Sequence, residues 1–334
     1  MIAQYLALSP KEKTELLSQT AARMGVDPVI VEKDLWVSAI LGVLFTHPDT
    51  KDRFVFKGGT SLSKVYGAIR RFSEDIDLIM DWRLLGLGGS DIDPWDAERS
   101  RTKQDKFNKA LGTKTEEYLR DTFVPFLRVQ LPADVDVSAS DAVAQGVVAR
   151  YPAIYSSAYV QDGVLLEIGP LASWVPSVWK TIVPEVSRYY PRILGDEVIP
   201  VKVTTAERTF WEKVTIAHQI AHSNKEIPPR YARHYYDIVM LFRSGVAATA
   251  LRDAELLRSV AEFKERFYPS RAARYDLARP GTVRILPGDE RLAELARDYR
   301  NMATMFYGPP PDWQALVVEL RRLERSINTT QREL

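Results

Sequence analysis

Two aspartates, Asp75 and Asp77, stand two positions apart at the start of an apolar run that ends at Met80. If this run forms a strand, its side chains alternate and both carboxylates point to the same face, with Cα atoms roughly 6.5–7 Å apart. Carboxylates at that spacing can share divalent cations, and Mg²⁺ prefers one or two carboxylates together with phosphate oxygens of a substrate. Two such ions activate an attacking oxygen and stabilise a leaving one. The pair therefore predicts metal-dependent chemistry on a phosphate group.

A glycine turn stands shortly before this pair. We expect a strand at residues 53–56 and a helix at residues 62–69, joined by a turn that contains Gly58, Gly59, Thr60 and Ser61. Glycines let backbone N–H groups approach a phosphate closely, and the start of the following helix adds its positive end. The two hydroxyl side chains can donate further hydrogen bonds. The turn therefore predicts a phosphate-binding loop that faces the carboxylates.

Together these segments resemble a known family. Residues 56–64, Phe-Lys-Gly-Gly-Thr-Ser-Leu-Ser-Lys, and residues 71–78, Arg-Phe-Ser-Glu-Asp-Ile-Asp-Leu, are similar to those of the AbiEii-type nucleotidyltransferase toxins of the DNA polymerase beta-like superfamily. The resemblance implies an α/β (α+β mixed) fold with a polymerase beta-like mixed sheet, flanking helices and a C-terminal helical domain. It also implies that the glycine turn and Lys64 bind the nucleotide.

A third carboxylate on a later strand belongs to the pattern of that superfamily. Glu167, inside the apolar run 164–168, matches it best. A lone acidic residue in an apolar strand is costly unless it is paired or bound to a metal. Asp134 and Asp136, also two positions apart, are competing candidates that the sequence leaves open.

The second half of the chain extends the resemblance to residues 207–213, which end in Lys213, and to residues 233–238. It implies catalytic roles for Lys213 and Asp237 and a nucleotide-binding role for Arg233. Lysine is a point charge suited to a triphosphate, and arginine can donate two parallel hydrogen bonds to phosphate oxygens. Asp237 would orient one of these cations or approach the nucleotide. The competing interpretation is that these are surface charges of amphipathic helices.

The function that the resemblance implies is transfer of a nucleoside monophosphate from an NTP to an acceptor. The implied acceptor is the 3′ end of tRNA, the implied metal is Mg²⁺ (or Mn²⁺), and the implied setting is a toxin–antitoxin or phage-defence system with an antitoxin encoded nearby. Two alternatives stay open. The acceptor could be a small molecule or a protein side chain, or the chain could be a nucleotide-binding regulator without catalysis.

Two further sites follow. Ser73 stands two residues before Asp75, and some members of the family that the chain resembles are silenced by phosphorylation of a hydroxyl residue at this place. RNA binding is expected in residues 264–284, where basic and aromatic residues alternate; the candidates are Arg271, Arg274, Tyr275 and Arg279. Such arginines contact phosphates and such rings stack on unpaired bases. Alternatively, the arginines pair with neighbouring acidic residues and the rings fill the core.

The elements that must position these residues divide the chain near residue 204. Residues 1–203 are expected to form the nucleotidyltransferase domain with N-terminal helices, and residues 204–334 a helical domain that completes the nucleotide site and binds the acceptor. Beyond the two strands around the glycine turn, the sequence predicts four strands, at residues 124–131, 146–151, 164–168 and 198–203. Capping boxes are expected at Ser9–Glu12 and Thr204–Glu207.

Composition excludes several classes of protein. The chain of 334 residues has no cysteine, so it has neither disulfides nor a thiolate zinc site. Its net charge of +1 argues against a protein that coats DNA. The N-terminus lacks a basic segment followed by an apolar core, and no run approaches the roughly 18 apolar residues of a membrane span. We therefore expect a cytoplasmic protein without membrane contact, and a monomer.

Overall fold

The computed structural model describes residues 1–86, 94–96, 99–157, 160–170 and 176–329. The chain folds into two compact units. The first contains Met1–Val65 and Phe72–Thr204, and the second contains Tyr66–Arg71 together with Thr205–Leu334. The second unit thus takes six residues from the middle of the first, immediately before the Asp75–Asp77 pair.

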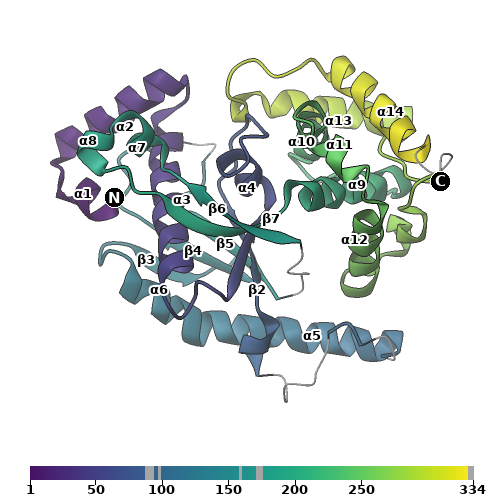
Figure 1. The fold of residues 1–334 in the computed structure, drawn as a ribbon, viewed down its shortest axis with the longest axis horizontal. Helices are drawn as coiled ribbons and strands as arrows, with labels where there is room; N and C mark the ends of the chain where they lie inside the picture. The colour runs from purple at the N-terminus through teal and green to yellow at the C-terminus, as the bar shows by residue number, and fades with distance from the viewer. Residues whose placement is uncertain (87–93, 97–98, 158–159, 171–175, 330–334) are drawn as a thin grey trace. The chain divides into compact units, whose positions relative to one another are not determined.

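A mixed sheet organises the first unit (Figure 1). Its described strands follow the spatial order β3-β4-β5-β2-β1-β7-β6. The bounds are β1 Phe54–Lys57, β2 Ile76–Met80, β3 Asp136–Ala139, β4 Gly146–Arg150, β5 Val164–Gly169, β6 Ser177–Ile182 and β7 Ile199–Thr204. The pairs β2–β5 and β1–β7 are parallel, and the other neighbouring pairs are antiparallel. The most central strands, β5, β2 and β1, are the ones that carry the predicted site.

The helices of the first unit are α1 Ile2–Ala7, α2 Pro10–Met24, α3 Pro28–Thr46, α4 Gly58–Lys64, α5 Arg101–Tyr118, α6 Val124–Gln130, α7 Glu185–Tyr189 and α8 Pro191–Leu194. The predicted Ser9–Glu12 capping box is present, and Gly25 at φ 68° ends α2. Asp27 caps α3 by accepting from the Val29 N–H. Helix α3 is apolar on nearly all sides and packs on the sheet, where Trp36 stacks on Tyr151 at 5.0 Å.

One predicted strand is wrong. Within the predicted strand 124–131, residues Val124–Gln130 form the helix α6, which follows one π-helical turn at Leu119–Phe123. The buried side chains Phe123 and Leu127 are four apart, whereas Val129 is 79% exposed, so burial follows the helical period rather than the alternation of a strand. Pro125 occupies the first turn, where its missing N–H costs nothing. A short apolar run cannot distinguish these two structures by itself.

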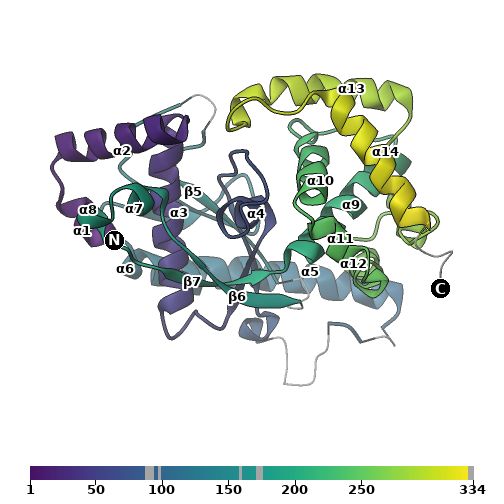
Figure 2. The same ribbon diagram turned by 45° about the horizontal axis from the view of Figure 1, so that its top comes forward.

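The described part of the second unit is helical (Figure 2). Its helices are α9 Ala206–His222, α10 Arg233–Arg243, α11 Val246–Ala250, α12 Ala254–Phe267, α13 Asp289–Asn301 and α14 Trp313–Thr329. Helix α9 packs against α10, α11 and α12, and α14 packs against α10. The predicted capping box at Thr204–Glu207 is wrong by one residue, since Thr205 caps α9 by accepting from the Arg208 N–H. Thr204 is not available because it pairs with Ser177 in the sheet.

The described residues contain no helix that is long and apolar enough to cross a membrane. The observed fold is mixed α/β, as the sequence predicted, with a sheet in one unit and helices alone in the described part of the other.

Candidate active site

Three adjacent strands bring the predicted catalytic residues of the first unit together. Asp77 on β2 pairs with Glu167 on the parallel neighbour β5 and with Lys57 on the antiparallel neighbour β1. Register partners on neighbouring strands lie about 4.8 Å apart and point to the same face. Asp77 and Glu167 are half-buried, while the residues next to them in each strand are buried. This face of the sheet is therefore the one that carries the acidic residues.

The same register decides between the candidates for the third carboxylate. Asp136 lies on β3, and β4 and β5 separate it from β2. Asp136 and Asp134 are both exposed. At about 4.8 Å per strand spacing, Asp136 is roughly 14 Å away across the sheet. Glu167 is the candidate that neighbours Asp77.

The glycine turn begins where β1 ends, and its first residue packs directly on Asp77. Gly58 has φ +80°, and a Cβ atom built on it would lie 1.9 Å from Asp77 Oδ2. Only glycine fits both the backbone conformation and the space. A hydrogen bond also connects the turn to the aspartate segment, because Thr60 Oγ1 donates to the Asp75 carbonyl oxygen at 2.6 Å. Ser61 Oγ donates to the Gly58 carbonyl oxygen at 2.9 Å.

These hydroxyls are thus occupied within the turn rather than pointing to a ligand. Thr60 and Ser61 are buried, and both help to fix the start of α4. Gly58 and Gly59 open that helix, and the β-strand before it aims the helix start at the face that bears Asp77. The backbone of the turn, rather than its side chains, is what this geometry offers to a phosphate.

Asp75 lies one residue before β2 and is strongly perturbed. Burial, together with the negative charges of Glu74, Asp77 and Glu167, raises the pKa of Asp75 to about 7, against the opposing effect of Lys33. Its Oδ1 atom is buried and has no hydrogen-bond partner among the residues that the structure describes. A buried carboxylate oxygen without a donor is costly. A cation bound to this oxygen would relieve both the missing partner and the repulsion between carboxylates.

The residues fit a divalent metal that shares its coordination with a substrate. Among the described residues, no three His, Cys, Asp or Glu side chains are arranged to hold a metal ion by themselves. Mg²⁺ does not require such a set, because it is usually held by one or two carboxylates plus substrate phosphates and water. Asp75 with its unpaired oxygen and Asp77 beside the glycine turn provide that donor set. Mn²⁺ also accepts carboxylate oxygens.

A buried lysine behind the carboxylates was not predicted from the sequence. Lys33 on α3 donates from Nζ to Glu74 Oε2 at 3.2 Å and to the Gln161 carbonyl oxygen at 2.6 Å. Glu74 also accepts from the Gln161 N–H at 2.9 Å. Burial lowers the pKa of Lys33, and the charges of Glu74 and Asp75 oppose that shift. The only sequence signal was the run Glu32-Lys33-Asp34 within an otherwise apolar helix.

Lys64, predicted to bind the nucleotide, is paired inside the first unit instead. Its ammonium group bonds to the carboxylate of Asp34, and its side chain is only 4% exposed. The second oxygen of Asp34 accepts from the Glu185 N–H at 2.8 Å. The Lys64–Asp34 pair therefore joins α4, α3 and the start of α7, and the nucleotide-binding role of Lys64 stays a prediction.

In the second unit, Asp237 is held between two cations. Its Oδ1 accepts from Arg71 Nε at 2.7 Å, and its Oδ2 accepts from an Arg71 terminal nitrogen at 2.7 Å and from Lys213 Nζ at 2.7 Å. All three side chains are buried. Burial opposes ionisation, but the charges of Arg71 and Lys213 outweigh it and hold the pKa of Asp237 well below its usual range. Burial lowers the pKa of Lys213 despite Asp237.

The predicted link between Lys213 and Asp237 is thus a direct ion pair, and the structure adds Arg71 to it. Arg233, at the start of α10, is half-buried and contributes positive charge that lowers the pKa of Lys213. Three residues, 72–74, separate Arg71 from Asp75 in the chain. The covalent connection therefore runs directly from this ion-pair network to the carboxylate cluster.

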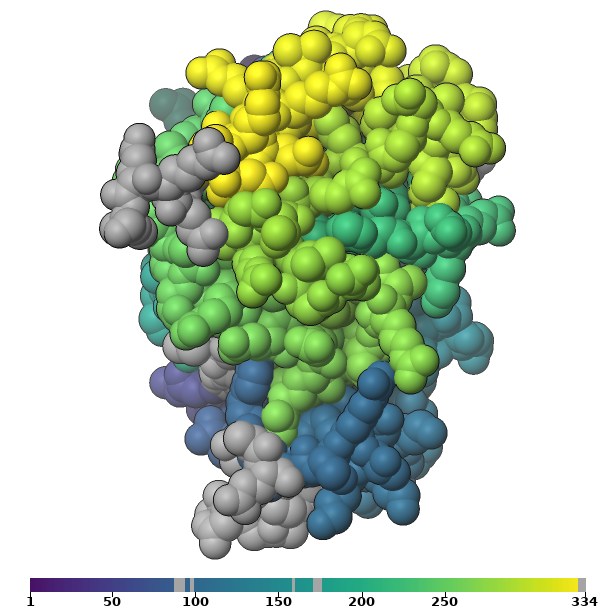
Figure 3. Space-filling model, turned by 90° about the vertical axis from the view of Figure 1, so that its right-hand side faces the viewer, coloured from purple at the N-terminus to yellow at the C-terminus, as the bar shows by residue number. Residues whose placement is uncertain are grey.

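The predicted RNA-binding segment forms part of the surface of the second unit (Figure 3). Arg271, Arg274 and Arg279 are exposed, and Arg274 pairs with Asp276 at 2.9 Å. Tyr275 is only 9% exposed and contacts the Gln219 side chain through its hydroxyl at 3.2 Å, so its ring packs in the unit. Tyr268, 53% exposed, is the ring of this segment that reaches solvent.

His218 fixes the segment to α9. Its Nδ1 accepts from the Arg284 N–H at 3.0 Å, which leaves Nε2 protonated to donate to the Arg274 carbonyl oxygen at 3.0 Å. Burial lowers the pKa of His218, in keeping with the neutral ring. The arginines are therefore presented by a loop with fixed backbone.

A mixed sheet with a glycine turn packed on an Asp-x-Asp pair, and a third carboxylate on the adjacent strand, defines the nucleotidyltransferase class. A family model described as "Nucleotidyl transferase AbiEii toxin, Type IV TA system" matches residues 40–319, and the chain belongs to this family. It is thus a nucleotidyltransferase toxin of a type IV toxin–antitoxin system, and this membership implies an NTP substrate and an antitoxin partner.

Comparison with solved structures finds similarity to MenT4, a nucleotidyltransferase toxin from Mycobacterium tuberculosis. The sequence identity is 16%, the match covers 94% of this chain and 98% of that chain, and the TM-score is 0.45. No curated protein matches the chain in sequence.

Proposed function

We propose that this chain transfers a nucleoside monophosphate from an NTP to the 3′ end of an RNA, with the acceptor end of tRNA as the substrate. The observation that carries the proposal is the contact between Gly58 and Asp77. This contact supports the proposal because the backbone of the glycine turn lies against a carboxylate suited to a metal. Asp75, with its unpaired buried oxygen, and Glu167, across the β2–β5 register, complete the cluster.

Each residue has a role that follows from its position. Divalent ions, when bound, supply charge that activates the attacking oxygen and stabilises the leaving one. Asp75 and Asp77 would hold these ions, and Glu167, which neighbours Asp77 in the β2–β5 register, would accept a proton from the attacking hydroxyl. Gly58 and Gly59 offer backbone N–H groups to the triphosphate.

The second unit supplies positive charge. Arg71, Lys213 and Arg233 together carry three positive charges against the single carboxylate of Asp237. We propose that this excess stabilises the pyrophosphate that develops during transfer. Asp237 acts by positioning Lys213 and Arg71 rather than by touching the substrate.

The proposal is tested by incubating the protein with each labelled NTP, Mg²⁺ or Mn²⁺, and total tRNA. Asp75→Asn and Asp77→Asn keep the side-chain size and remove the charge, so transfer should fall by more than about a hundredfold while circular dichroism is unchanged. Asp136→Asn, an exposed aspartate of the same sheet, is the matched control and should keep full activity. If either active-site variant keeps a tenth of the wild-type rate at saturating metal, the metal assignment is wrong.

Lys213→Ala tests the contribution of the second unit. The expected result is a loss of kcat/KM for the NTP of about tenfold or more, because a charge near the triphosphate is removed. An unchanged kcat/KM would assign Lys213 to stability alone. Labelling of small molecules or proteins in place of tRNA would identify a different acceptor for the same chemistry.

A further inference from the structure

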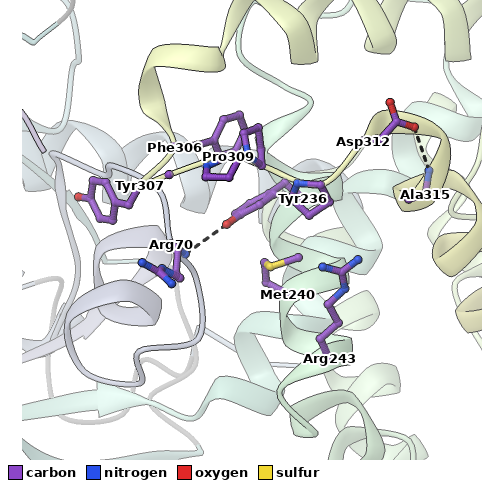
Figure 4. A pocket seen from close by; sticks show the side chains of 12 residues that line it. Arg70, Tyr236, Met240, Arg243, Phe306, Tyr307, Pro309, Asp312 and Ala315 are labelled. Carbon is purple, nitrogen blue, oxygen red and sulfur yellow. Dashed lines mark hydrogen bonds between the residues drawn. The ribbon is translucent and has the colours of Figure 1, made fainter. Parts of the chain in front are cut away.

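A cavity of about 680 Å³ lies within the second unit, next in sequence to the Arg71–Asp237 pair (Figure 4). Arg70 and Tyr307 lie on one side of it, Met240 and Arg243 on another, and Phe306 and Pro309 along its rim. Ligand pockets typically measure about 300–1,000 Å³. The cavity is therefore large enough for one nucleotide with its flanking phosphates.

The wall of this cavity is a segment held in a fixed position. Phe306 forms a β-bridge with Arg71, and the Tyr307 N–H donates to the Arg70 carbonyl oxygen at 3.0 Å. The Arg70 N–H donates to the Tyr236 hydroxyl at 3.3 Å, and the rings of Tyr236 and Phe306 are 4.8 Å apart. The backbone that shapes the cavity is thus the backbone that presents Arg71 to Asp237.

Among the residues that line the cavity, Arg70 provides the cation that can contact a phosphate. Arg70 is exposed, and within the described residues its guanidinium has no carboxylate partner. Arg243 is neutralised, because its Nε donates to both carboxylate oxygens of Glu319 at 3.1 Å. Asp312 keeps its negative charge, but it accepts from the N–H groups of Gln314 and Ala315 at the start of α14 and lies on the opposite side of the cavity from Arg70 (Figure 4). A single unpaired cation suits one phosphodiester, which carries one negative charge, and does not suit a triphosphate.

The apolar surfaces of the cavity indicate what the rest of the ligand is. Tyr307 offers an aromatic ring, and the run Pro309-Pro310-Pro311 offers apolar surface without N–H donors. Such surfaces favour a planar, partly apolar group, and aromatic side chains that stack unpaired bases are the common means of binding single-stranded RNA.

We infer that this cavity binds an unpaired nucleotide of the acceptor RNA strand, with the base against Tyr307 and the prolines and the adjoining phosphodiester on Arg70. The inference rests on the proposed function, since it assigns a binding site to the RNA substrate of that reaction. It leaves the incoming NTP to the glycine turn and the carboxylates.

Binding is measured without catalysis. A fluorescently labelled RNA tetranucleotide is titrated with the Asp75→Asn protein, and anisotropy gives Kd at several salt concentrations. Arg70→Ala, added to that variant, should weaken binding about tenfold and reduce the salt slope by about 0.7, the value for one phosphate of a single strand. Tyr307→Ala should also weaken binding about tenfold, and Tyr307→Phe should restore it because the ring is kept. Arg252→Ala, an exposed arginine of the same unit outside the cavity, should change nothing.

Steady-state kinetics of the proteins with Asp75 intact separate the two hypotheses. Arg70→Ala should raise the KM for tRNA about tenfold and leave the KM for the NTP unchanged. If tRNA is labelled normally and neither Arg70→Ala nor Tyr307→Ala alters RNA binding, the cavity assignment is wrong and the proposed function stands. If the KM for the NTP rises instead, the cavity serves the nucleotide donor. If wild-type protein labels no RNA and binds none, both are wrong.

Discussion

At the scale of single residues, the glycine turn and the carboxylate of Asp77 depend on each other, because Gly58 packs directly on Asp77. Any side chain at position 58 must displace the Asp77 carboxylate, because the nearest oxygen is 1.9 Å from where Cβ would stand. The φ of +80° adds a second requirement for glycine. Position 58 is therefore constrained by the close approach of Asp77 and by backbone geometry together.

Gly58→Ala should lower transfer by more than about a hundredfold, because the metal-binding oxygen moves out of place. Gly25→Ala is the matched control, since Gly25 also has a positive φ, 68°, but has open space around its Cβ position. The control should lose about 1 kcal/mol of stability and no activity. Transfer rates and thermal unfolding of both variants check this, and equal activity of the two would contradict the assigned role of Gly58.

Ser73 is half-buried and lies before β2 rather than within it, since the strand begins at Ile76. We propose that phosphorylation of Ser73 would control activity, because a phosphate adds a charge of about −1.5 to −2 close in sequence to Asp75. Ser73→Glu should reduce transfer at least tenfold. Ser73→Gln, of the same size without charge, should retain most activity. Comparable rates for the two variants would rule out an electrostatic effect at this position.

At the scale of elements, the ion-pair network couples α9 and α10 to residues 66–71. Asp237→Asn leaves two buried cations without a counter-charge, and breaking a buried pair in this way costs about 3–5 kcal/mol. Arg258→Ala removes an exposed ion pair with Glu255 and should leave the free energy of unfolding nearly unchanged. Chemical denaturation measures both. A small effect of Asp237→Asn would mean that water or rearrangement compensates the buried cations.

We expect acidification to destabilise the attachment of the loop that His218 bonds to α9. The pKa of His218 is lowered in the folded state by burial, with His222 opposing protonation and Asp276 favouring it. Because folding lowers the pKa of His218, the unfolded chain binds the proton at a higher pH than the folded chain does. The stabilisation is therefore complete above the usual pKa of about 6.5 and is lost as pH falls below it.

Protonated Nδ1 can no longer accept from the Arg284 N–H. Hydrogen exchange of the backbone around residue 284 should accelerate between pH 7.5 and 5.5, after correction for intrinsic rates. His218→Gln, which has no titrating group, should remove this additional acceleration. His47→Gln, a histidine in the first unit, is the control and should leave it unchanged. An identical pH dependence in wild type and His218→Gln would exclude the mechanism.

At the scale of the whole molecule, a net charge of +1 means that the RNA binding proposed above would have to come from local patches of positive charge. Arg271 and Arg274 are exposed on the loop that His218 holds. Replacing both by alanine should weaken tRNA binding and reduce its salt slope by about 1–2, with NTP binding unchanged. Arg252→Ala together with Arg300→Ala removes the same charge elsewhere and serves as the control. Equal salt slopes in the two double variants would move the RNA site away from this loop.

The sequence by itself determined the local chemistry. Asp75, Asp77 and the glycine turn are close in the chain, so alternation in a strand and the φ freedom of glycine were enough to predict a phosphate and metal site. The family followed from the same short segments. The capping box at Ser9 and the helical character of the second half were also predicted, because both depend on near neighbours in sequence.

Only the tertiary structure decided which distant residues meet. Strand order placed Glu167, and not Asp136, beside Asp77, because side-chain patterns within a strand carry no information about its neighbours. Three buried ion pairs likewise arise from contacts between residues far apart in the chain. They join Lys64 to Asp34, Arg71 to Asp237 and Lys33 to Glu74. Residues Val124–Gln130 became a helix because Phe123 and Leu127 bury together on one side. Burying a charge is costly without a partner, and the identity of that partner is fixed only when the chain has folded.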